Sequence, residues 1–386
     1  MSLEQWIFLI VAAVLILLYF PIAVMQDWLL LRNRKTFRNK CKHDDADNTA
    51  RKVLCVITTN GKNPMVVEHI IGVVKSYYLP VELFVIKEER DKFRYSCSEI
   101  VVPASYETKN NTKNKMRALQ YGIEWLHNRG YGAESYICHL DDDSIPTMDY
   151  LEHIFTMKEE AGQGYIRLRK AGIHMLSTLA DMARVSNCDS FCQFFNSIGR
   201  PKSVHGEGLV IRADVEYEIG WDYGTYGCDD LIMGQMIVKK GYRFGFIPHA
   251  IMIAPPVSAR DFYKQRRRWI ISILWAQRKL REIDARAMNW FLYRYAVGWT
   301  GMVGVIIAIV GFVYGFRIPL PLEVLLGFNL LSYFLFYQYG TARTSKRFML
   351  SMAMLQIPVA LYEGGTLIYS LLFPPNIDSF DVITKV

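Results

Sequence analysis

Four apolar segments, each close to the length that crosses a lipid bilayer, limit what this chain can fold into. Three of them carry no charge: residues 6–25, 295–316 and 324–342. The fourth, residues 348–373, is apolar apart from Glu363. A helix of about 20 apolar residues crosses the hydrocarbon core of a bilayer. The sequence therefore predicts about four transmembrane helices, one before and three after a polar centre.

The basic residues border these apolar segments unevenly. Six Lys and Arg residues lie between residues 32 and 42 and seven between residues 264 and 281, whereas Arg317 alone separates the second and third segments. Cytoplasmic loops next to membrane spans are rich in Lys and Arg. We therefore predict a multi-pass membrane protein with a cytoplasmic polar domain and both termini on the outer or lumenal side. The net charge of +8 favours membrane lipid as a partner, and we expect no nucleic-acid partner.

Apolar stretches of strand length alternate with helical spacing in the first part of the polar centre. The predicted strands are residues 52–58, 81–86, 99–103 and 136–140, and the predicted helices are residues 65–77 and 112–127. Such alternation indicates an α/β fold with a mostly parallel, doubly wound sheet. This layout is typical of nucleotide-binding domains. The stretch lacks both the Gly-rich dinucleotide fingerprint and a P-loop, which favours a nucleotide-sugar over NAD or ATP.

The second part of the polar centre is less regular. We predict helices over residues 149–161, 176–185 and 229–238, a Gly-containing turn that leads into a strand over 204–211, a last strand over 242–248 and an amphipathic helix that carries residues 262–280. The apolar side chains of that last helix share one face and its basic residues lie elsewhere around it, which is typical of a helix at a membrane surface.

Three consecutive acids, Asp141 to Asp143, follow the apolar run of residues 136–140. The carboxyl ends of strands are where open α/β sheets bind ligands. Asp141 and Asp143 project to the same side of an extended chain, and their hard oxygen atoms suit one divalent metal ion. The alternative is a solvated acidic turn.

The seven cysteines lie in the predicted cytoplasmic part, where reduced thiols are expected. Cys188 and Cys192 are four residues apart, but no other Cys or His pair completes a zinc motif. The sequence alone therefore predicts no metal at these two cysteines.

Three motifs occur in a fixed order: D-D-D at 141–143, D-D at 229–230 and Q-R-R-R-W at 265–269. This order is similar to that of membrane-bound glycosyltransferase family 2, the cellulose-synthase-like group. The sequence motifs typical of this group are D-x-D, [T/G]-[E/D]-D and Q-x-x-R-W, and they precede transmembrane helices. Residues 163–222 look closest to the egghead-type β-mannosyltransferases, through T-L-A-D-M-A-R-V at 178–185, the F-F-N-S-I-G-R-P-K that follows and the H-G-E-G turn.

The resemblance implies a donor site. Asp141 and Asp143 would hold Mg²⁺ or Mn²⁺ on the diphosphate of a nucleotide-sugar. The residues that would assist in donor binding are Asp142, Lys115, Arg268, Glu88 and Glu89. Lys115 lies in N-K-M-R-A-L, and its alternative is a surface lysine. The two glutamates stand where most members of the family have Asp residues that contact the base and ribose, and this difference agrees with guanine in place of uracil.

The resemblance also implies a catalytic and acceptor site. Asp230 would be the base that removes the proton of the acceptor hydroxyl, with Asp229 beside it in place of the more usual Glu. The residues expected near the acceptor are Trp269, Gln265, His205 and Gly206. The alternatives are an interfacial anchor for Trp269, a lipid-facing cation for Arg268 and a structural role for His205.

These expectations define a domain plan and a function. The plan is a first transmembrane helix (1–31), a basic linker (32–50), a GT-A, Rossmann-like catalytic domain (51–258), amphipathic interface helices (259–292), transmembrane helices 2–4 (293–375) and a C-terminal tail (376–386). The expected function is inverting, metal-dependent transfer of one sugar, mannose from GDP-mannose, to a lipid-linked glycan or glycolipid. The alternatives are a processive polysaccharide synthase that uses a UDP-sugar and a non-catalytic membrane module that binds nucleotide-sugars.

Overall fold

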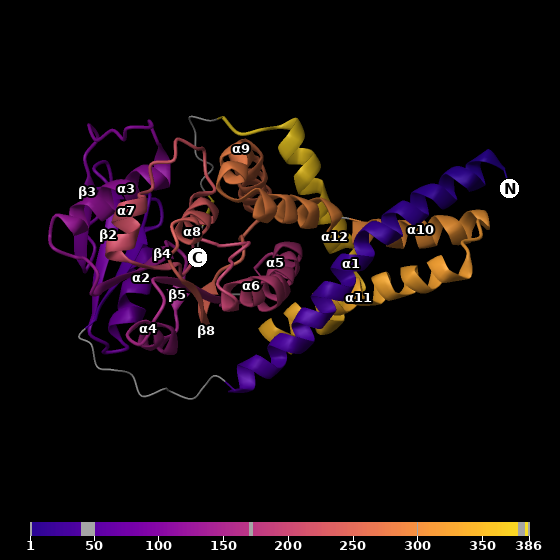
Figure 1. Ribbon diagram of the computed structural model, residues 1–386, viewed down its shortest axis with the longest axis horizontal. Helices are drawn as coiled ribbons and strands as arrows, with labels where there is room; N and C mark the ends of the chain where they lie inside the picture. The colour runs from indigo at the N-terminus through magenta and orange to yellow at the C-terminus, as the bar shows by residue number, and fades with distance from the viewer. Residues whose placement is uncertain (1, 40–50, 170–172, 299, 377–382, 385–386) are drawn as a thin grey trace.

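A mixed eight-stranded β-sheet organises the polar part of the chain (Figure 1). The computed structural model describes residues 2–39, 51–169, 173–298, 300–376 and 383–384. The strands lie in the order β3-β2-β1-β4-β7-β6-β8-β5. Their bounds are β1 Lys52–Thr58, β2 Val81–Glu88, β3 Ser98–Val102, β4 Ser135–Asp141, β5 Ile145–Pro146, β6 Ala161–Leu168, β7 Val210–Arg212 and β8 Phe244–Ile253.

The helices fall into two groups. Those around the sheet are α2 Pro64–Lys75, α3 Asn114–His127, α4 Met148–Ile154, α5 Met175–Asn187, the π-helix η1 Cys188–Cys192, α6 Gln193–Ser197, α7 Ala213–Ile219, α8 Asp229–Lys239 and α9 Ala259–Val297. The apolar ones are α1 Leu3–Asn39, α10 Thr300–Tyr314, α11 Leu320–Thr344 and α12 Met349–Leu372, with the short 3₁₀ helix η2 Lys346–Phe348 before α12.

Most strands of the sheet share one direction. Strands β1 to β4 are parallel to their neighbours within that set, as predicted, and β6 is parallel to β8. Strand β7 runs antiparallel to both β4 and β6, and β5 runs antiparallel to β8. The sheet is therefore mixed, and β5 and β7 are the strands that depart from the predicted parallel arrangement. A three-residue strand that follows the long helical excursion from α5 to α6 takes its direction from packing, which no local pattern reveals.

Alternate residues of β1 contribute to two hydrophobic cores on opposite faces of the sheet. Val53, Cys55 and Ile57 belong to the core that includes α2, and Leu54 and Val56 belong to the core that includes α3. Successive side chains of a strand point to opposite faces. A strand buried on both faces therefore reads as an uninterrupted apolar run, which is why this strand could be predicted.

The segment between α4 and α5 differs from the prediction. The helix predicted over residues 149–161 ends at Ile154, and β6 begins at Ala161. Gly162 and Gly164 disfavour a helix and allow β6 to lie close to β8. A Cβ atom on Gly164 would collide with the backbone oxygen of His249. The glycines therefore mark a close approach of two backbones.

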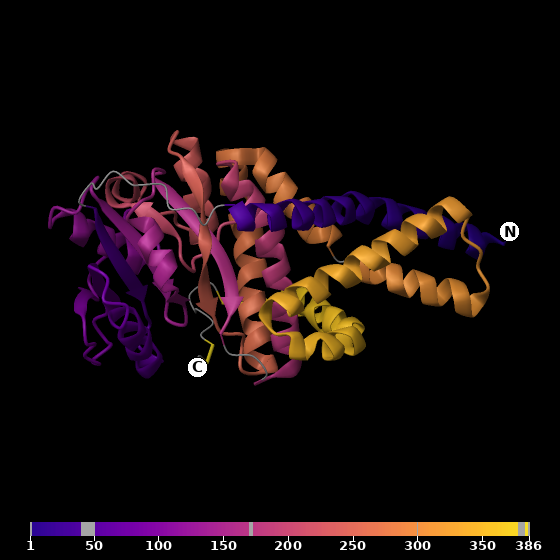
Figure 2. The ribbon, with the colours of Figure 1, turned by 90° about the horizontal axis from the view of Figure 1, so that it is seen from below.

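The apolar helices α1, α10 and α11 project from the sheet as an arm, and Figures 1 and 2 both show them side by side. Among the described residues, two helices are long and apolar enough to cross a membrane: Leu3–Asn33 within α1 and Leu320–Thr344, which is α11. The prediction of about four such helices is therefore wrong.

The other two predicted spans fail for different reasons. The first residues of segment 295–316 belong to α9, and α10 has only 15 residues. Gly315, with φ of 63°, follows the end of α10. Helix α12 carries the buried polar side chains Gln356, Thr366 and Ser370 and packs along α9 and α5. Its polar face therefore belongs to the protein interior.

The N-terminus lies at the tip of the arm, whereas the C-terminus lies at the sheet-bearing part (Figure 1). Helices α10 and α11 carry the chain out along the arm and back. The backbone N–H of Thr384 donates a hydrogen bond to Asp261 Oδ1 at 3.3 Å, at the start of α9. Thr384 therefore lies against the sheet-bearing part, which does not agree with the predicted position of the C-terminus on the side opposite the polar domain, and the membrane topology stays a prediction. The predicted linker is helical as far as Asn39, while residues 40–50 and most of the predicted tail lie outside the described residues.

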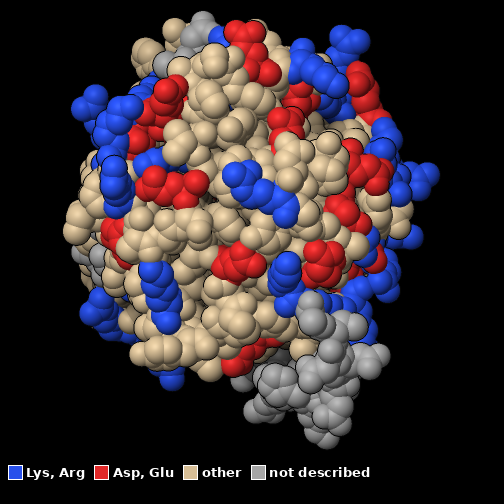
Figure 3. Space-filling view, turned by 90° about the vertical axis from the view of Figure 1, so that its left-hand side faces the viewer, with Lys and Arg blue, Asp and Glu red and all other residues tan. Residues whose placement is uncertain are grey.

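The predicted amphipathic helices form one long helix, α9, with a kink at Asp284 (φ −146°, ψ 96°). Ala276 and Leu280 are buried in the core that includes α3 and α8, whereas the buried Phe262 stacks on Tyr362 of α12 with ring centroids 4.6 Å apart. Gln265 and Arg266 are buried as well. The face of the sheet-bearing part turned away from the arm shows acidic and basic side chains interspersed (Figure 3).

Candidate active site

A large cavity lies where the carboxyl ends of β1 and β4 meet α8, α9 and the apolar helices. Its volume is about 1280 Å³. One end is lined by polar residues that include Asp141 and Asp229, and the other by apolar-helix residues that include Ile22 and Ala360. Of the thirteen site residues that the sequence predicts, Glu89 alone is absent from the lining of this cavity.

Lys115 links the two acidic motifs. Strand β4 ends at Asp141, and Lys115 lies in the first turn of α3. The Lys115 Nζ atom is 2.5 Å from Asp141 Oδ1 and 3.8 Å from Asp229 Oδ2. Although burial opposes its charge, the carboxylates of Asp141 and Asp229 raise the pKa of Lys115 above its ordinary value. The lysine is therefore a fixed cation at the carboxyl edge of the sheet. Asp142 and Asp143, next to Asp141, are buried.

The second acidic pair begins α8. Cys228 precedes it in the left-handed conformation with φ of 64°. Asp230 Oδ1 accepts a hydrogen bond from the backbone N–H of Leu231 at 2.8 Å. Burial and the negative charge of Asp229 raise the pKa of Asp230 to about 8. A carboxylate with a raised pKa is a stronger base than an ordinary aspartate.

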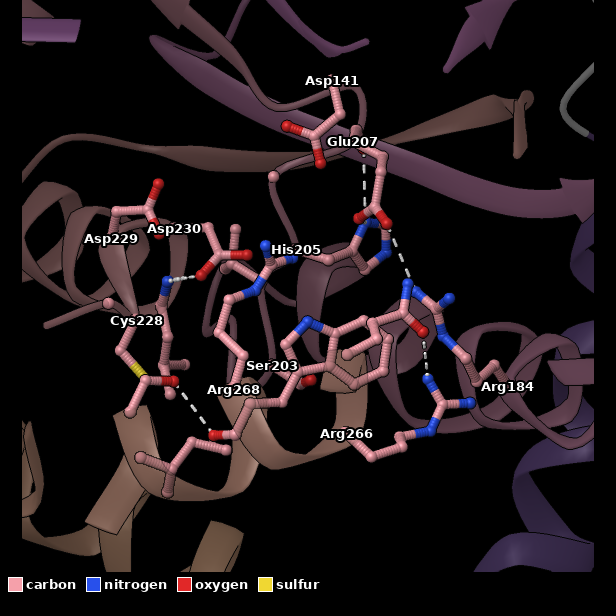
Figure 4. A pocket seen from close by; sticks show the side chains of 18 of the residues that line it. Asp141, Arg184, Ser203, His205, Glu207, Cys228, Asp229, Asp230, Arg266 and Arg268 are labelled. Carbon is pink, nitrogen blue, oxygen red and sulfur yellow. Dashed lines mark hydrogen bonds and ion pairs between the residues drawn. The ribbon is translucent and has the colours of Figure 1, made fainter. Parts of the chain in front are cut away.

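The turn that carries His205 and Gly206 lies against this acidic site (Figure 4). A Cβ atom on Gly206 would lie 3.0 Å from Lys115 Nζ and 3.8 Å from both carboxylate oxygens of Asp141. The absence of a side chain keeps this space open. Glu207 faces Arg184 (Nη2 to Oε1, 3.3 Å) and His205 (Nδ1 to Oε2, 3.5 Å). Against the opposing effect of burial, Arg184 and His205 hold the pKa of Glu207 below its ordinary value.

Sequence reasoning did not single out Glu207 or Arg184 as site residues. Both stand inside motifs that carried the resemblance, H-G-E-G and T-L-A-D-M-A-R-V. A charged residue within a shared motif was the signal that could have identified them. Their spatial pairing joins α5 to the turn before β7, which are distant in the sequence.

Trp269 is held at the cavity wall by two arginines. The guanidinium carbons of Arg184 and Arg266 lie 4.6 and 4.4 Å from the Trp269 ring centroid, within the range of cation–π contacts. Both arginines pair with the buried Asp181 of α5 (Arg266 Nη2 at 2.5 Å, Arg184 Nη1 at 3.7 Å). Because this charge network fixes the two guanidiniums, it also restricts the position of the indole.

Gln265 and Arg268 lie on either side of Arg266 and Arg267 in the sequence and differ in their surroundings. Gln265 is buried, and its Oε1 accepts a hydrogen bond from Arg266 Nη1 at 2.8 Å. Arg268 extends from α9 into the space beside Asp230 (Figure 4). The arginine therefore places a cation in the cavity, while the glutamine contributes to its wall.

Glu88 and Glu89 lie at the end of β2, where contacts to a nucleotide base were expected. Glu88 lines the cavity and accepts hydrogen bonds from Arg117 Nη1 at 2.9 and 2.7 Å. Glu89 instead accepts a hydrogen bond from the backbone N–H of Ala104 at 2.9 Å and is outside the lining. The structure therefore brings Glu88, and not Glu89, to the site.

A second cluster of chemically active side chains lies in the same cavity. Ligand atoms of Cys188, Cys192 and His205 all lie within 4.8 Å of one another. The hydrogen bond from the Cys188 thiol and the electrostatic effects of His205 and Arg294 lower the pKa of Cys192 to about 6. The sequence did not connect His205 with these cysteines because it stands in a separate turn.

Fold and motifs together define the class of protein. The first half of the sheet is parallel and carries acidic residues at its carboxyl edge. The helix that contains Gln265, Arg268 and Trp269 precedes apolar helices. These are the features of a GT-A-like α/β domain joined to candidate membrane helices. Residues 136–362 match the family model described as glycosyl transferase family group 2. The chain belongs to this family, which confirms the family that the motifs indicated.

Comparison with known proteins gives relatives that match part of the chain. The chain is 30% identical over 254 residues to β-1,4-mannosyltransferase bre-3 of Caenorhabditis briggsae, a match that covers 62% of this chain and 56% of that protein. It is 31% identical over 185 residues to β-1,4-mannosyltransferase egh of Drosophila melanogaster, covering 46% of this chain and 40% of that protein. The chain thus spans about half the length of the curated relatives it matches.

A solved structure resembles the whole fold. It is described as mannosyltransferase PcManGT from Pyrobaculum calidifontis in complex with GDP-Man and Mn2+. The TM-score is 0.58, and the match covers 95% of this chain and 100% of that chain at 15% sequence identity. At this identity the likeness shows the fold, an α/β GT-A-like domain with a mixed sheet.

Proposed function

We propose that the protein is an inverting, metal-dependent mannosyltransferase that transfers one mannose from GDP-mannose to a lipid-linked acceptor and forms a β-linkage. The observation that carries this proposal is the cavity that joins Lys115, Asp141 and Asp230 to the apolar helices. The donor assignment is supported by the relatives named β-1,4-mannosyltransferases and by the GDP-Man of the structural neighbour.

Asp141 and Asp143 are the residues that would hold Mg²⁺ or Mn²⁺. Their oxygen atoms are the hard ligands that both ions prefer, and both residues line the same cavity. When bound, such an ion neutralises charge on the diphosphate of the donor. Lys115 and Arg268 add fixed positive charge at the same end of the cavity, where it stabilises a departing diphosphate.

Asp230 is the proposed general base. It removes the proton of the acceptor hydroxyl as the new C1–O bond to the acceptor forms and the C1–O bond to the diphosphate breaks. An attack assisted by one base displaces the diphosphate in a single step, so an α-linked donor gives a β-linked product. The pKa of about 8 is near the working pH, where general-base catalysis is most effective.

The acceptor is proposed to enter from the apolar helices. The cavity continues to Tyr19 and Ile22 of α1, Tyr333 of α11 and Ala360 of α12. An apolar wall suits a lipid chain, and the flat indole of Trp269 at the polar end suits a sugar ring. We propose that α1 and α11 cross the membrane, with the sheet-bearing domain at the cytoplasmic face and the N-terminus on the opposite side.

A donor panel tests this function. The full-length protein in detergent is incubated with GDP-mannose, UDP-glucose or UDP-GlcNAc and a mixed polyprenyl-glycan and glycolipid acceptor pool, and products are analysed by mass spectrometry. We expect the addition of one hexose from GDP-mannose only. A ladder of products from a UDP-sugar would instead favour a processive synthase, and donor binding without transfer would favour a non-catalytic module.

A further inference from the structure

The side chains of Cys188, Cys192 and His205 lie close enough together to bind one metal ion. Within the part of the chain that the structure describes, it is the one group of three His, Cys, Asp or Glu side chains whose ligand atoms lie so close together. Cys188 Sγ is 3.6 Å from His205 Nε2. A tetrahedral zinc ion with bonds of about 2.3 Å to sulfur and 2.0 Å to nitrogen separates these two atoms by about 3.5 Å.

The local backbone presents both thiols to the same space. Cys188 and Cys192 begin and end the π-helical segment η1 that follows α5. Residues four apart in a helix lie on the same face, and π-helical turns occur often at functional sites. The two cysteines are 2% and 6% exposed, yet both line the cavity. A bound ion would therefore be shielded on the protein side and would keep a fourth position open to the cavity.

His205 is oriented for ligation through Nε2. Its other ring nitrogen, Nδ1, lies 3.3 Å from the backbone oxygen of Glu207 and 3.5 Å from Glu207 Oε2. Histidines that bind metal ions typically donate their second ring N–H to a carboxylate or a backbone carbonyl. Arg184 in turn holds the Glu207 carboxylate at 3.3 Å. The oxygen atoms of Glu207 that would accept a hydrogen bond from the imidazole of a metal-bound His205 are therefore already in place.

We propose that Cys188, Cys192 and His205 form a binding site for Zn²⁺ that fastens the turn at residues 203–207 to the end of α5. The ligand set is softer than the carboxylates of Asp141 and Asp143, so the two sites select different ions. Because Gly206 lies against Lys115 and Asp141, the zinc ion also holds the turn that carries Gly206 in position beside the donor site. The site is independent of whether mannose is the sugar transferred.

Metal content and cobalt absorption test the site on the intact chain. The protein is purified in detergent after expression with added zinc, and metal is measured by mass spectrometry. We expect one zinc per chain, and Co²⁺ added to the zinc-free protein should produce thiolate-to-cobalt charge-transfer absorption. In Cys192→Ser and Cys188→Ser, zinc affinity should fall by at least about tenfold. Hydrogen exchange of residues 203–208 should slow when zinc is added to the wild-type protein.

Two control variants test whether the loss of zinc is specific to this cluster. Cys97→Ser removes a thiol outside the cluster, and Asp143→Asn alters the proposed Mg²⁺ or Mn²⁺ site. Both should keep one zinc per chain. The proposal is overturned if the wild-type chain binds no zinc and shows no cobalt–thiolate absorption. It is also overturned if Cys188 and Cys192 are joined in a disulfide in the freshly purified protein, or if the two Cys→Ser variants retain full zinc affinity.

Discussion

The two ends of the cavity are built in different ways. At the sheet end, charged side chains hold one another: Lys115 lies between Asp141 and Asp229. At the end formed by the apolar helices, the wall includes aromatic and aliphatic side chains such as Tyr333 and Ala360. The sheet end comes from short motifs, whereas the other end brings together helices from opposite ends of the chain. We infer that the residues for donor chemistry come from short sequence motifs. The surface that selects the acceptor instead depends on the tertiary packing of distant helices.

Replacement of Asp230 should produce the largest loss at the sheet end. Asp230→Asn removes the proposed base but keeps the size of the side chain, so transfer should fall by about 10² to 10⁴, while donor binding stays nearly unchanged. Initial rates and calorimetric binding of GDP-mannose measure both quantities. The matched control is Asp149→Asn, an exposed carboxylate outside the cavity, which should leave the rate unchanged. Full activity in Asp230→Asn would remove this residue as the base.

The pH dependence of transfer should report the same residue. Arg268 on α9 extends beside Asp230 (Figure 4). Burial, Asp229 on α8 and Glu207 before β7 raise the pKa of Asp230, Lys115 on α3 lowers it, and the resulting pKa is about 8. Below that pH the carboxyl is protonated and cannot accept a proton. We therefore expect kcat/KM to rise about tenfold per pH unit up to this value and then level off. A kcat/KM that does not change between pH 6 and 8 would contradict the assignment of Asp230 as the base. The residual activity of Asp230→Asn should not show the rise of kcat/KM with pH.

A bulkier side chain on α12 should affect only the end of the cavity that the apolar helices form. Ala360→Phe fills part of the cavity, so KM for a lipid acceptor should rise about tenfold, a value typical of a lost apolar contact of 1–2 kcal/mol. GDP-mannose affinity should not change, which also verifies that the variant is folded. Leu361→Phe, at an exposed neighbouring position, is the control. Equal losses in donor and acceptor affinity would show that the two ends are not separable.

The two adjacent glutamates at the end of β2 should differ in their effect on the donor. Glu88→Gln alters a cavity residue paired with Arg117 and should weaken GDP-mannose binding by about threefold to tenfold, an effect of about 1 kcal/mol. Glu89→Gln lies outside the lining and should change donor affinity less than about twofold. Isothermal titration of both variants measures the difference. The reverse order would place the base-binding contact at Glu89.

Local patterns predicted the parts of the structure that depend on local chemistry. The apolar run of β1 and the acids after β4 were found because burial on two faces and a ligand-binding edge leave clear marks in the sequence. Strand β6 was missed because Gly162 and Gly164 give it no alternating pattern. The link between Glu207 and Arg184, and between His205 and Cys188, depends on how α5 packs against a later turn. No spacing in the sequence contains that information.

The predicted membrane helices show the same limit. Length and composition identified α1 and α11 as candidate membrane spans, and in the structure both are long and apolar enough to cross a membrane. Length and composition could not reveal that residues 295–297 complete α9, that α12 packs along α5 and α9, or that Gln356 and Glu363 of α12 form hydrogen bonds with α11. The positive-inside pattern gave a consistent topology for four spans, whereas the described residues contain two candidate spans, and the topology stays a prediction.

The central claim is that one cavity performs one inverting transfer of mannose to a lipid-linked acceptor. The proton NMR spectrum of the product formed from GDP-mannose tests it most directly, because it reports both the number of sugars added and their anomeric configuration. We predict one new anomeric signal, that of a β-linked mannose. An α-linked product, or several new anomeric signals from a growing chain, would contradict the account.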